Sequence, residues 1–151
     1  MDSIYEDVEL LAVKYDRLVR TLPDVDIKSM VAADPKVMST EIVSNIERML
    51  LLFQLFPGSK AKVRRMISEA PRLLYCEDIR DLLKRTCDCI KRVYPKETDE
   101  GCMYAVSEEP ALLFDLPNLK IFEERNNRID IAELPMTVQE MLVYATRNEK
   151  E

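Results

Sequence analysis

The chain has 151 residues, of which 33% are charged and only two are glycine. This length suffices for one domain with its own core, and the scarcity of glycine disfavours a sheet with many tight turns. The longest apolar run, Met49–Phe53, is far too short to cross a membrane. The acidic start of the chain does not resemble a secretory signal peptide. There is no histidine, so the commonest general base and metal ligand is missing, and we expect no catalytic site, metal or cofactor.

Four cysteines, Cys76, Cys87, Cys89 and Cys102, lack the spacing of a metal site. We expect them to be reduced thiols that are buried or half-buried. The acidic pairs Glu108-Glu109 and Glu123-Glu124 are typical of a solvated surface rather than of acid–base catalysis.

Proline recurs with a period of 34 to 39 residues. A large apolar residue precedes one proline of each unit (Leu22-Pro23, Phe56-Pro57, Tyr94-Pro95), and a second proline follows 12 to 15 residues later (Pro35, Pro71, Pro110). Apolar residues keep the same register around the second proline: Ile27, Val31, Val37 and Met38; Val63, Ile67, Leu73 and Leu74; Cys102, Val106, Leu112 and Leu113. Such a period predicts stacked supersecondary units that bury one shared core.

In chain order, the pattern predicts helices over residues 3–21, 25–33, 40–53, 60–69, 77–93 and 97–107, each pair broken at a proline. Ser3 with Glu6, and later Ser39, are the expected N-terminal caps. After Pro110 we expect a shorter helix over 117–125 with proline in its first turn. We then expect a loop or short extended stretch over 128–135. The last expected helix runs over 137–148 and begins with a capping box of Thr137 and Glu140.

The helical spacing also predicts which side chains of the long helices face inward. They are Val8, Leu11, Tyr15, Leu18 and Leu22; then Ile42, Ile46, Met49, Leu50 and Phe53; then Ile79, Leu82, Leu83, Thr86 and Ile90. The expected fold is all-α, a short α-solenoid of about three helix-pair repeats over 1–115, followed by an irregular C-terminal capping segment over 116–151.

The charge is distributed unevenly. Residues 56–96 hold eleven basic and five acidic side chains, whereas residues 1–55 hold six and ten, and residues 97–151 hold five and thirteen. The basic middle is a candidate surface for phosphate, anionic lipid or an acidic partner. The alternative is the exposed face of two amphipathic helices, balanced by nearby acids. The candidate partner-binding residues are Lys60, Lys62, Arg64, Arg65, Arg72, Arg80, Lys84, Arg85, Lys91 and Arg92.

The unit of a short helix, a proline break with an apolar pair, and a longer helix resembles the repeat of the mitochondrial transcription termination factor family. The best match is residues 63–74, echoed by 27–38 and 102–113. This resemblance implies a curved superhelix in mitochondria or chloroplasts, commonly with a basic concave face for nucleic acid. Two departures weaken the nucleic-acid implication: leucine-proline or its variants replace the family's frequent leucine-glycine, and only the middle unit is basic.

We therefore expect a non-enzymatic interaction protein, an accessory or scaffold subunit of a larger photosynthetic, respiratory or ribosomal complex in an organelle. The first alternative is an organellar nucleic-acid-binding protein that uses the basic middle unit. A weaker alternative is a peripheral protein that the same bases hold to anionic lipid.

Overall fold

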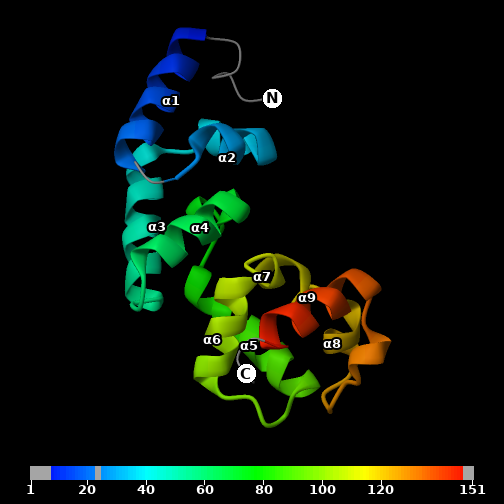
Figure 1. Cartoon of the computed structure of the whole chain (residues 1–151). Helices are drawn as coiled ribbons and strands as arrows, with labels where there is room; N and C mark the ends of the chain where they lie inside the picture. The colour runs from blue at the N-terminus through cyan, green and yellow to red at the C-terminus, as the bar shows by residue number, and fades with distance from the viewer. Residues whose placement is uncertain (1–7, 23–24, 148–151) are drawn as a thin grey trace. The chain divides into compact units, whose positions relative to one another are not determined.

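The computed structural model describes residues 8–22 and 25–147. Within these ranges every regular element is an α-helix or a 3₁₀ turn, and no strand forms, which confirms the all-α class. The chain divides into two compact units, unit 1 (Met1–Glu77) and unit 2 (Asp78–Glu151), which we describe separately (Figure 1).

Unit 1 contains two long helices and two short ones, in the order α1 (Val8–Thr21), α2 (Ile27–Ala33), η2 (Pro35–Ser39), α3 (Ile42–Leu55), α4 (Lys60–Glu69) and η3 (Pro71–Leu74). The long helices α1 and α3 lie on one side of unit 1, and α2 and α4 lie on the other (Figure 1). The 3₁₀ turns η2 and η3 contact each other and pack on α2, which places both proline breaks inside the unit.

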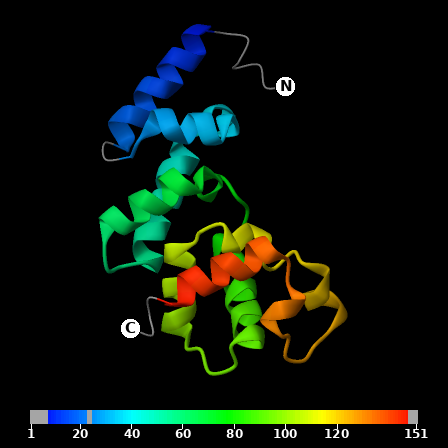
Figure 2. The same cartoon turned by 45° about the vertical axis from the view of Figure 1, so that its right-hand side comes forward.

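Unit 2 begins with α5 (Ile79–Val93), capped by the Asp78 side chain, and α6 (Asp99–Glu108), capped by Thr98. Four further elements follow: α7 (Leu112–Asp115), α8 (Lys120–Glu124), η4 (Ile131–Glu133) and α9 (Met136–Arg147). The last helix packs on α6 and α7, and Figure 2 shows it crossing in front of α6. One buried cluster joins side chains from α5 through α9, among them Ile90, Leu116 and Leu142. The segment after residue 115 therefore completes the core around α5 and α6.

The three proline breaks share one backbone geometry. Asp34, Ala70 and Glu109, which precede the prolines, have φ/ψ of −145°/85°, −135°/76° and −132°/81°. Each also closes its short helix by donating its backbone N–H to the carbonyl four residues earlier. The residue before proline is excluded from the helical basin, so proline ends each short helix in the same way.

Burial of the residues around these prolines follows the predicted register. All of them are buried except Val31, which is partly buried. The predicted inward face of α5 is also correct, since Ile79, Leu82, Leu83, Thr86 and Ile90 are all buried.

The predicted inward faces of α1 and α3 are partly wrong. Val8 is 78% exposed, Tyr15 38% and Leu50 53%, and the other predicted α3 positions are only half-buried. The residues that α3 buries are Asn45 and Leu52. Asn45 can be buried because its amide nitrogen donates to the Leu74 carbonyl, 3.1 Å away. Helix α3 therefore buries the side that carries Asn45 and Leu52 rather than its most apolar side.

Several helix limits also differ from expectation. Ser39 does not cap α3, because it lies in η2 and its hydroxyl donates to the Lys36 carbonyl. The helix expected over 117–125 is shorter, since Pro117 instead follows an additional helix, α7, whose end is capped by Asn118. The stretch 128–135 contains the 3₁₀ turn η4, closed by a capping box of Asp130 and Glu133. The expected cap of Ser3 and Glu6, and Asn148 of the last helix, lie outside the described residues.

Candidate protein interface

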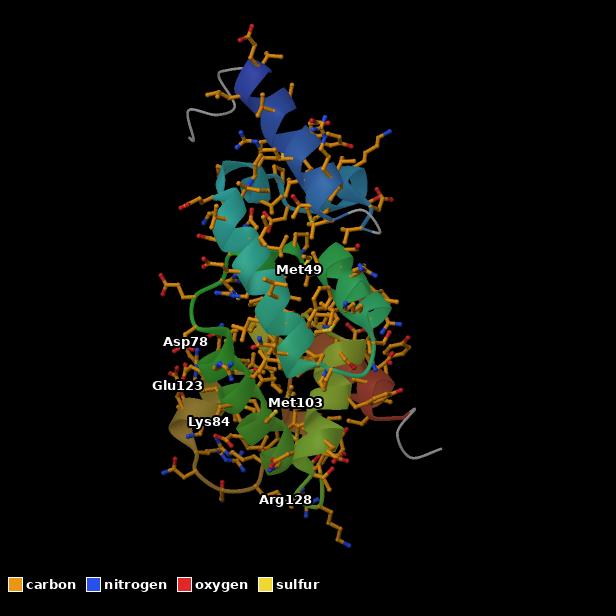
Figure 3. The ribbon with its side chains drawn as sticks, turned by 90° about the vertical axis from the view of Figure 1, so that its left-hand side faces the viewer. Met49, Asp78, Lys84, Met103, Glu123 and Arg128 are labelled. Carbon is orange, nitrogen blue, oxygen red and sulfur yellow. The ribbon has the colours of Figure 1, made fainter. Side chains whose placement is uncertain are left out.

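Large apolar side chains are exposed on α1 and α3. Across the described residues, the exposed large hydrophobic side chains lie on three helices, α1, α3 and α9. Those of unit 1 are Val8, Leu10, Val13, Tyr15 and Val19 on α1 and Val43 and Leu50 on α3, and we call the exposed surface of these two helices the α1–α3 face. Figure 3 looks onto this side of unit 1, with Met49 labelled on α3.

An apolar stripe repeats along α1 and α3, and its members are exposed on α1 but half-buried on α3. Counted back from Leu22 and Phe56, four positions of α1 match four of α3: Val8 with Ile42, Ala12 with Ile46, Tyr15 with Met49, and Val19 with Phe53. Both sets have the spacing i, i+4, i+7, i+11, typical of a stripe that docks another helix. On α5, counted back from Tyr94, the same positions are Arg80, Lys84, Cys87 and Lys91. These four positions are therefore apolar in the first two repeats and mostly basic in the third.

The charges on the α1–α3 face are mainly acidic. Its exposed acids are Glu9, Asp16, Glu41 and Glu47, and its exposed bases are Arg17 and Arg20. Arg20 pairs with Asp16 at 3.1 Å within α1. Away from the Phe53 end of α3, where Lys60 and Arg64 lie, the exposed charges of this face are thus net negative.

A buried lysine ties α1 to the start of α3. Lys14 is only 7% exposed, and its Nζ donates to the Thr40 carbonyl at 2.6 Å and to Asn45 Oδ1 at 2.8 Å. Burial, and secondarily the positive charge of Arg17, lowers the pKa of Lys14 to about 8. Both acceptors in these bonds are neutral oxygens, so within the described part of the chain these bonds hold the Lys14 charge by dipoles rather than by a carboxylate.

An arginine occupies the equivalent place in the next repeat. Lys14 and Arg48 each stand eight residues before the large apolar residue that closes their helix. Arg48 Nη1 donates to the Leu73 carbonyl and approaches Cys76 Sγ, both at 3.0 Å. Thr40 and Cys76, in turn, each stand five residues after a proline break. Each long helix of unit 1 is therefore joined to the proline break that follows it by a hydrogen bond from a cationic side chain to a backbone carbonyl.

A tyrosine joins the two breaks directly. The Tyr75 hydroxyl, just after η3, donates a short hydrogen bond to Asp34 Oδ2, just before η2. Burial, followed by the Asp34 carboxylate, raises the pKa of Tyr75 to about 12. The Lys36 ammonium lies 5.5 Å from the centroid of the same ring. These contacts hold the α1 and α3 repeats in one arrangement and so fix the α1–α3 face.

The predicted basic residues of unit 1 gather on α4 and η3. Lys60 and Arg64 lie over the Phe53 ring, 5.7 and 5.9 Å from its centroid. Arg65 stands 4.0 Å from Glu69. Lys62 is half-buried and Arg72 is exposed. Two of these cations therefore cover the end of the α3 stripe.

In unit 2 the predicted basic residues have different roles. Arg85 pairs with Asp81 at 2.9 Å, and Lys91 pairs with Asp99. Arg80 and Lys84 are exposed on α5, where Figure 3 labels Lys84.

Arg92 has an internal structural role. Its guanidinium donates to the carbonyls of Phe122 at 2.8 Å, Asn127 at 3.1 Å and Arg125. It also lies over the Phe122 ring, 5.2 Å from the centroid. Arg92 thus holds the segment that follows α8 against α5.

Two hollows occur in unit 2. One of about 520 Å³ lies at the turn between α5 and α6, lined by Tyr94, Lys96 and Arg128 among others. The other, about 340 Å³, runs along α9 beside Met136, Val143 and Tyr144. In the described part of the chain, no three Cys, Asp or Glu side chains lie together as a metal site would require. Over the same residues, no helix combines the length and apolarity needed to span a bilayer.

Sequence reasoning missed Lys14 and Arg48. The signal was available, because a cation stands at the same register position in both repeats, within the span of an otherwise apolar helix face. A long cationic side chain at such a position can reach a carbonyl at a helix or turn end.

Comparisons of this chain with protein-family models, with curated proteins and with solved structures returned no match.

Proposed function

We propose that this chain is a non-enzymatic helical-repeat interaction protein, an accessory or scaffold subunit that docks a helix of a partner protein on the α1–α3 face. The single observation that carries the proposal is the repeated apolar stripe on α1 and α3. Its α1 copy remains exposed, with Val8 at 78% and Val19 at 42%.

Helix α1 exposes five large apolar side chains while burying a lysine. An exposed apolar surface of this kind marks an interaction site. The bonds of Lys14, Arg48 and Tyr75 support a preformed surface, which lowers the entropy that binding must overcome.

The charges select the occupant. Away from the Phe53 end, where Lys60 and Arg64 lie, the acids of this face favour a partner helix with an apolar stripe flanked by lysine or arginine, because complementary charges raise the association rate and fix the register. Such a helix would lie on α1 and α3 as an amphipathic helix lies in an apolar groove. The same negative charge disfavours a polyanion at this face.

The basic residues offer weaker support for nucleic-acid binding. Arg92 is engaged with three carbonyls, and Arg85 and Lys91 are paired with acids of their own unit. An organellar setting for the complex rests on the resemblance of residues 27–38, 63–74 and 102–113 to the transcription termination factor repeat.

A peptide titration tests the proposal. The probe is a synthetic 21-residue amphipathic helix of leucine and lysine with a fluorescent label, and the reference is a scrambled peptide of the same composition. At about 0.15 M salt the helix should bind the whole chain in a fluorescence anisotropy titration, and the scrambled peptide should not. The double variant Val8→Ser, Val19→Ser, which removes two exposed members of the stripe, should bind at least about tenfold more weakly, a loss of ~1.4 kcal/mol.

A matched control lies on α9. Val143 is 52% exposed, between Val19 at 42% and Val8 at 78%, so Val143→Ser removes a similar apolar side chain from another surface. This variant should bind the helix like the parent protein. Equal loss in Val143→Ser, or equal binding of the scrambled peptide, would show non-specific adsorption and remove the case for the α1–α3 face.

A further inference from the structure

Two of the four cysteines face each other across α5 and α6. Cys102 on α6 is fully buried, and its sulfur lies 3.7 Å from the Cys87 carbonyl oxygen. This contact places the Cys102 sulfur beside Cys87 where α6 packs on α5. Cys87 itself is half-buried, so a small molecule can reach it while Cys102 stays covered.

The packing of α5 on α6 brings these sulfurs together. Gly101 and Ala105, which flank Cys102 on α6, are both buried. Their small side chains allow the two helices to lie close together. A disulfide needs the sulfurs at about 2.05 Å and the Cβ atoms at roughly 3.5–4.5 Å. Because the Cys102 sulfur already contacts the backbone of Cys87, rotation of the two side chains about their Cα–Cβ bonds can provide the approach.

The surroundings distinguish Cys87 from the other cysteines. The hydrogen bond from Cys102 lowers the pKa of the Cys87 thiol against the opposing effect of burial, and the ammonium of Lys91 acts in the same direction. Lys91 lies one turn further along α5 and is paired with Asp99. The same hydrogen bond raises the pKa of Cys102. Burial raises the pKa of Cys89 to about 11 and also raises that of Cys76.

We infer that Cys87 and Cys102 form a thiol–disulfide exchange site, in which Cys87 attacks a small-molecule disulfide such as glutathione disulfide and Cys102 resolves the adduct. The Cys87 thiolate attacks one sulfur of the small disulfide, forms a mixed disulfide and releases one thiolate, which takes up a proton. Cys102 then loses its proton and attacks the Cys87 sulfur, forming the internal disulfide and releasing the second small thiol. The protein loses two electrons and two protons, and one disulfide molecule becomes two thiols.

The internal disulfide would fasten α5 to α6 across 15 residues of chain. Closure of a loop restricts the unfolded chain, so the oxidised protein should melt at a higher temperature than the reduced protein. This inference concerns unit 2 alone and does not depend on the α1–α3 face.

Intact-mass measurement of the folded, full-length protein with glutathione disulfide tests the site. The parent protein should lose two hydrogen masses, and peptide mapping should show Cys87 joined to Cys102. Cys102→Ala should instead accumulate one glutathione on Cys87, because the resolving thiol is gone. Cys89→Ser should react like the parent, since Cys89 takes no part.

Two results would overturn the inference. One is a stable glutathione adduct on Cys87 of the parent protein without an internal disulfide, and the other is no reaction at Cys87 while the protein is folded. Because both are read from the unsubstituted chain, poor folding of a variant leaves the test intact. Circular dichroism before and after oxidation verifies that the helices persist.

Discussion

Truncation of Arg92 should destabilise unit 2 far more than loss of any other basic side chain of α5. Arg92→Ala removes three hydrogen bonds from a charged donor to backbone carbonyls. The bonds to Phe122 and Arg125 are partly buried and the bond to Asn127 is exposed. With about 1.5 kcal/mol for each partly buried bond and almost nothing for the exposed one, the free energy of unfolding should fall by about 3 kcal/mol.

Urea unfolding, monitored by circular dichroism, measures this loss of stability, and two further variants serve as comparisons. Arg92→Lys should recover only about half, because an ammonium cannot reproduce the planar fork of donors. Arg85→Ala removes an exposed pair with Asp81 and should cost at most ~0.5 kcal/mol. A loss below about 1 kcal/mol for Arg92→Ala, or full recovery by lysine, would refute the structural role assigned to this residue.

Three further predictions concern other parts of the molecule. The pKa of Lys14 is about 8 in the folded protein against 10.5 in the unfolded chain. Between these pH values the unfolded state binds more protons, so the contribution of Lys14 to stability rises with pH. In parallel urea titrations, the stability of the parent relative to Lys14→Met should increase by up to about 3 kcal/mol from pH 7.5 to 10.5, and a constant difference would contradict the buried charge. Leu74→Ala, at a side chain 1% exposed, should cost about 2–5 kcal/mol in the same assay, whereas the exposed Leu50→Ala should cost almost nothing. Mixed-sequence RNA or DNA should bind negligibly at about 0.15 M salt. Micromolar binding would instead favour the nucleic-acid alternative if it is abolished by reversing the charges of four residues, Arg64, Arg65, Lys84 and Arg85.

The proline register predicted most of the local structure. Helix α4 has the predicted limits, Lys60–Glu69, because Ser59 caps its start and Pro71 closes its end. The same arguments predicted the buried side of α5, because this helix has one clearly apolar face and one clearly polar face. Local rules suffice where the cap, the proline and the apolar stripe all indicate one arrangement.

The inward faces of α1 and α3 could not be predicted from apolarity alone. Lys14 and Asn45 are buried because each finds a carbonyl or amide partner in another element. Such partners lie 26 to 31 residues away in the chain, beyond any helical period. Sequence patterns order side chains by hydrophobicity, whereas a hydrogen-bonded polar side chain can take the buried place and leave valine or tyrosine outside.

The candidate site was predicted in a different place from the one that we propose. Net charge indicated residues 56–96, but charge counts do not show which cations are engaged internally, as Arg92 is. The apolar stripe on α1 and α3 resembled an ordinary core face in sequence, and only the exposed fractions distinguish it from one.

Site-specific photo-crosslinking of the full chain in its native assembly tests the central claim most directly. A photoreactive residue replaces Leu50 on the α1–α3 face or, as the matched reference, Val143 on α9, and mass spectrometry identifies the joined peptide. We predict that position 50 crosslinks to one protein segment whose sequence has an apolar helical stripe flanked by lysine or arginine, and that position 143 does not join that segment. Crosslinks from position 50 to nucleic acid, to an acidic segment or to the same peptides as position 143 would contradict the account.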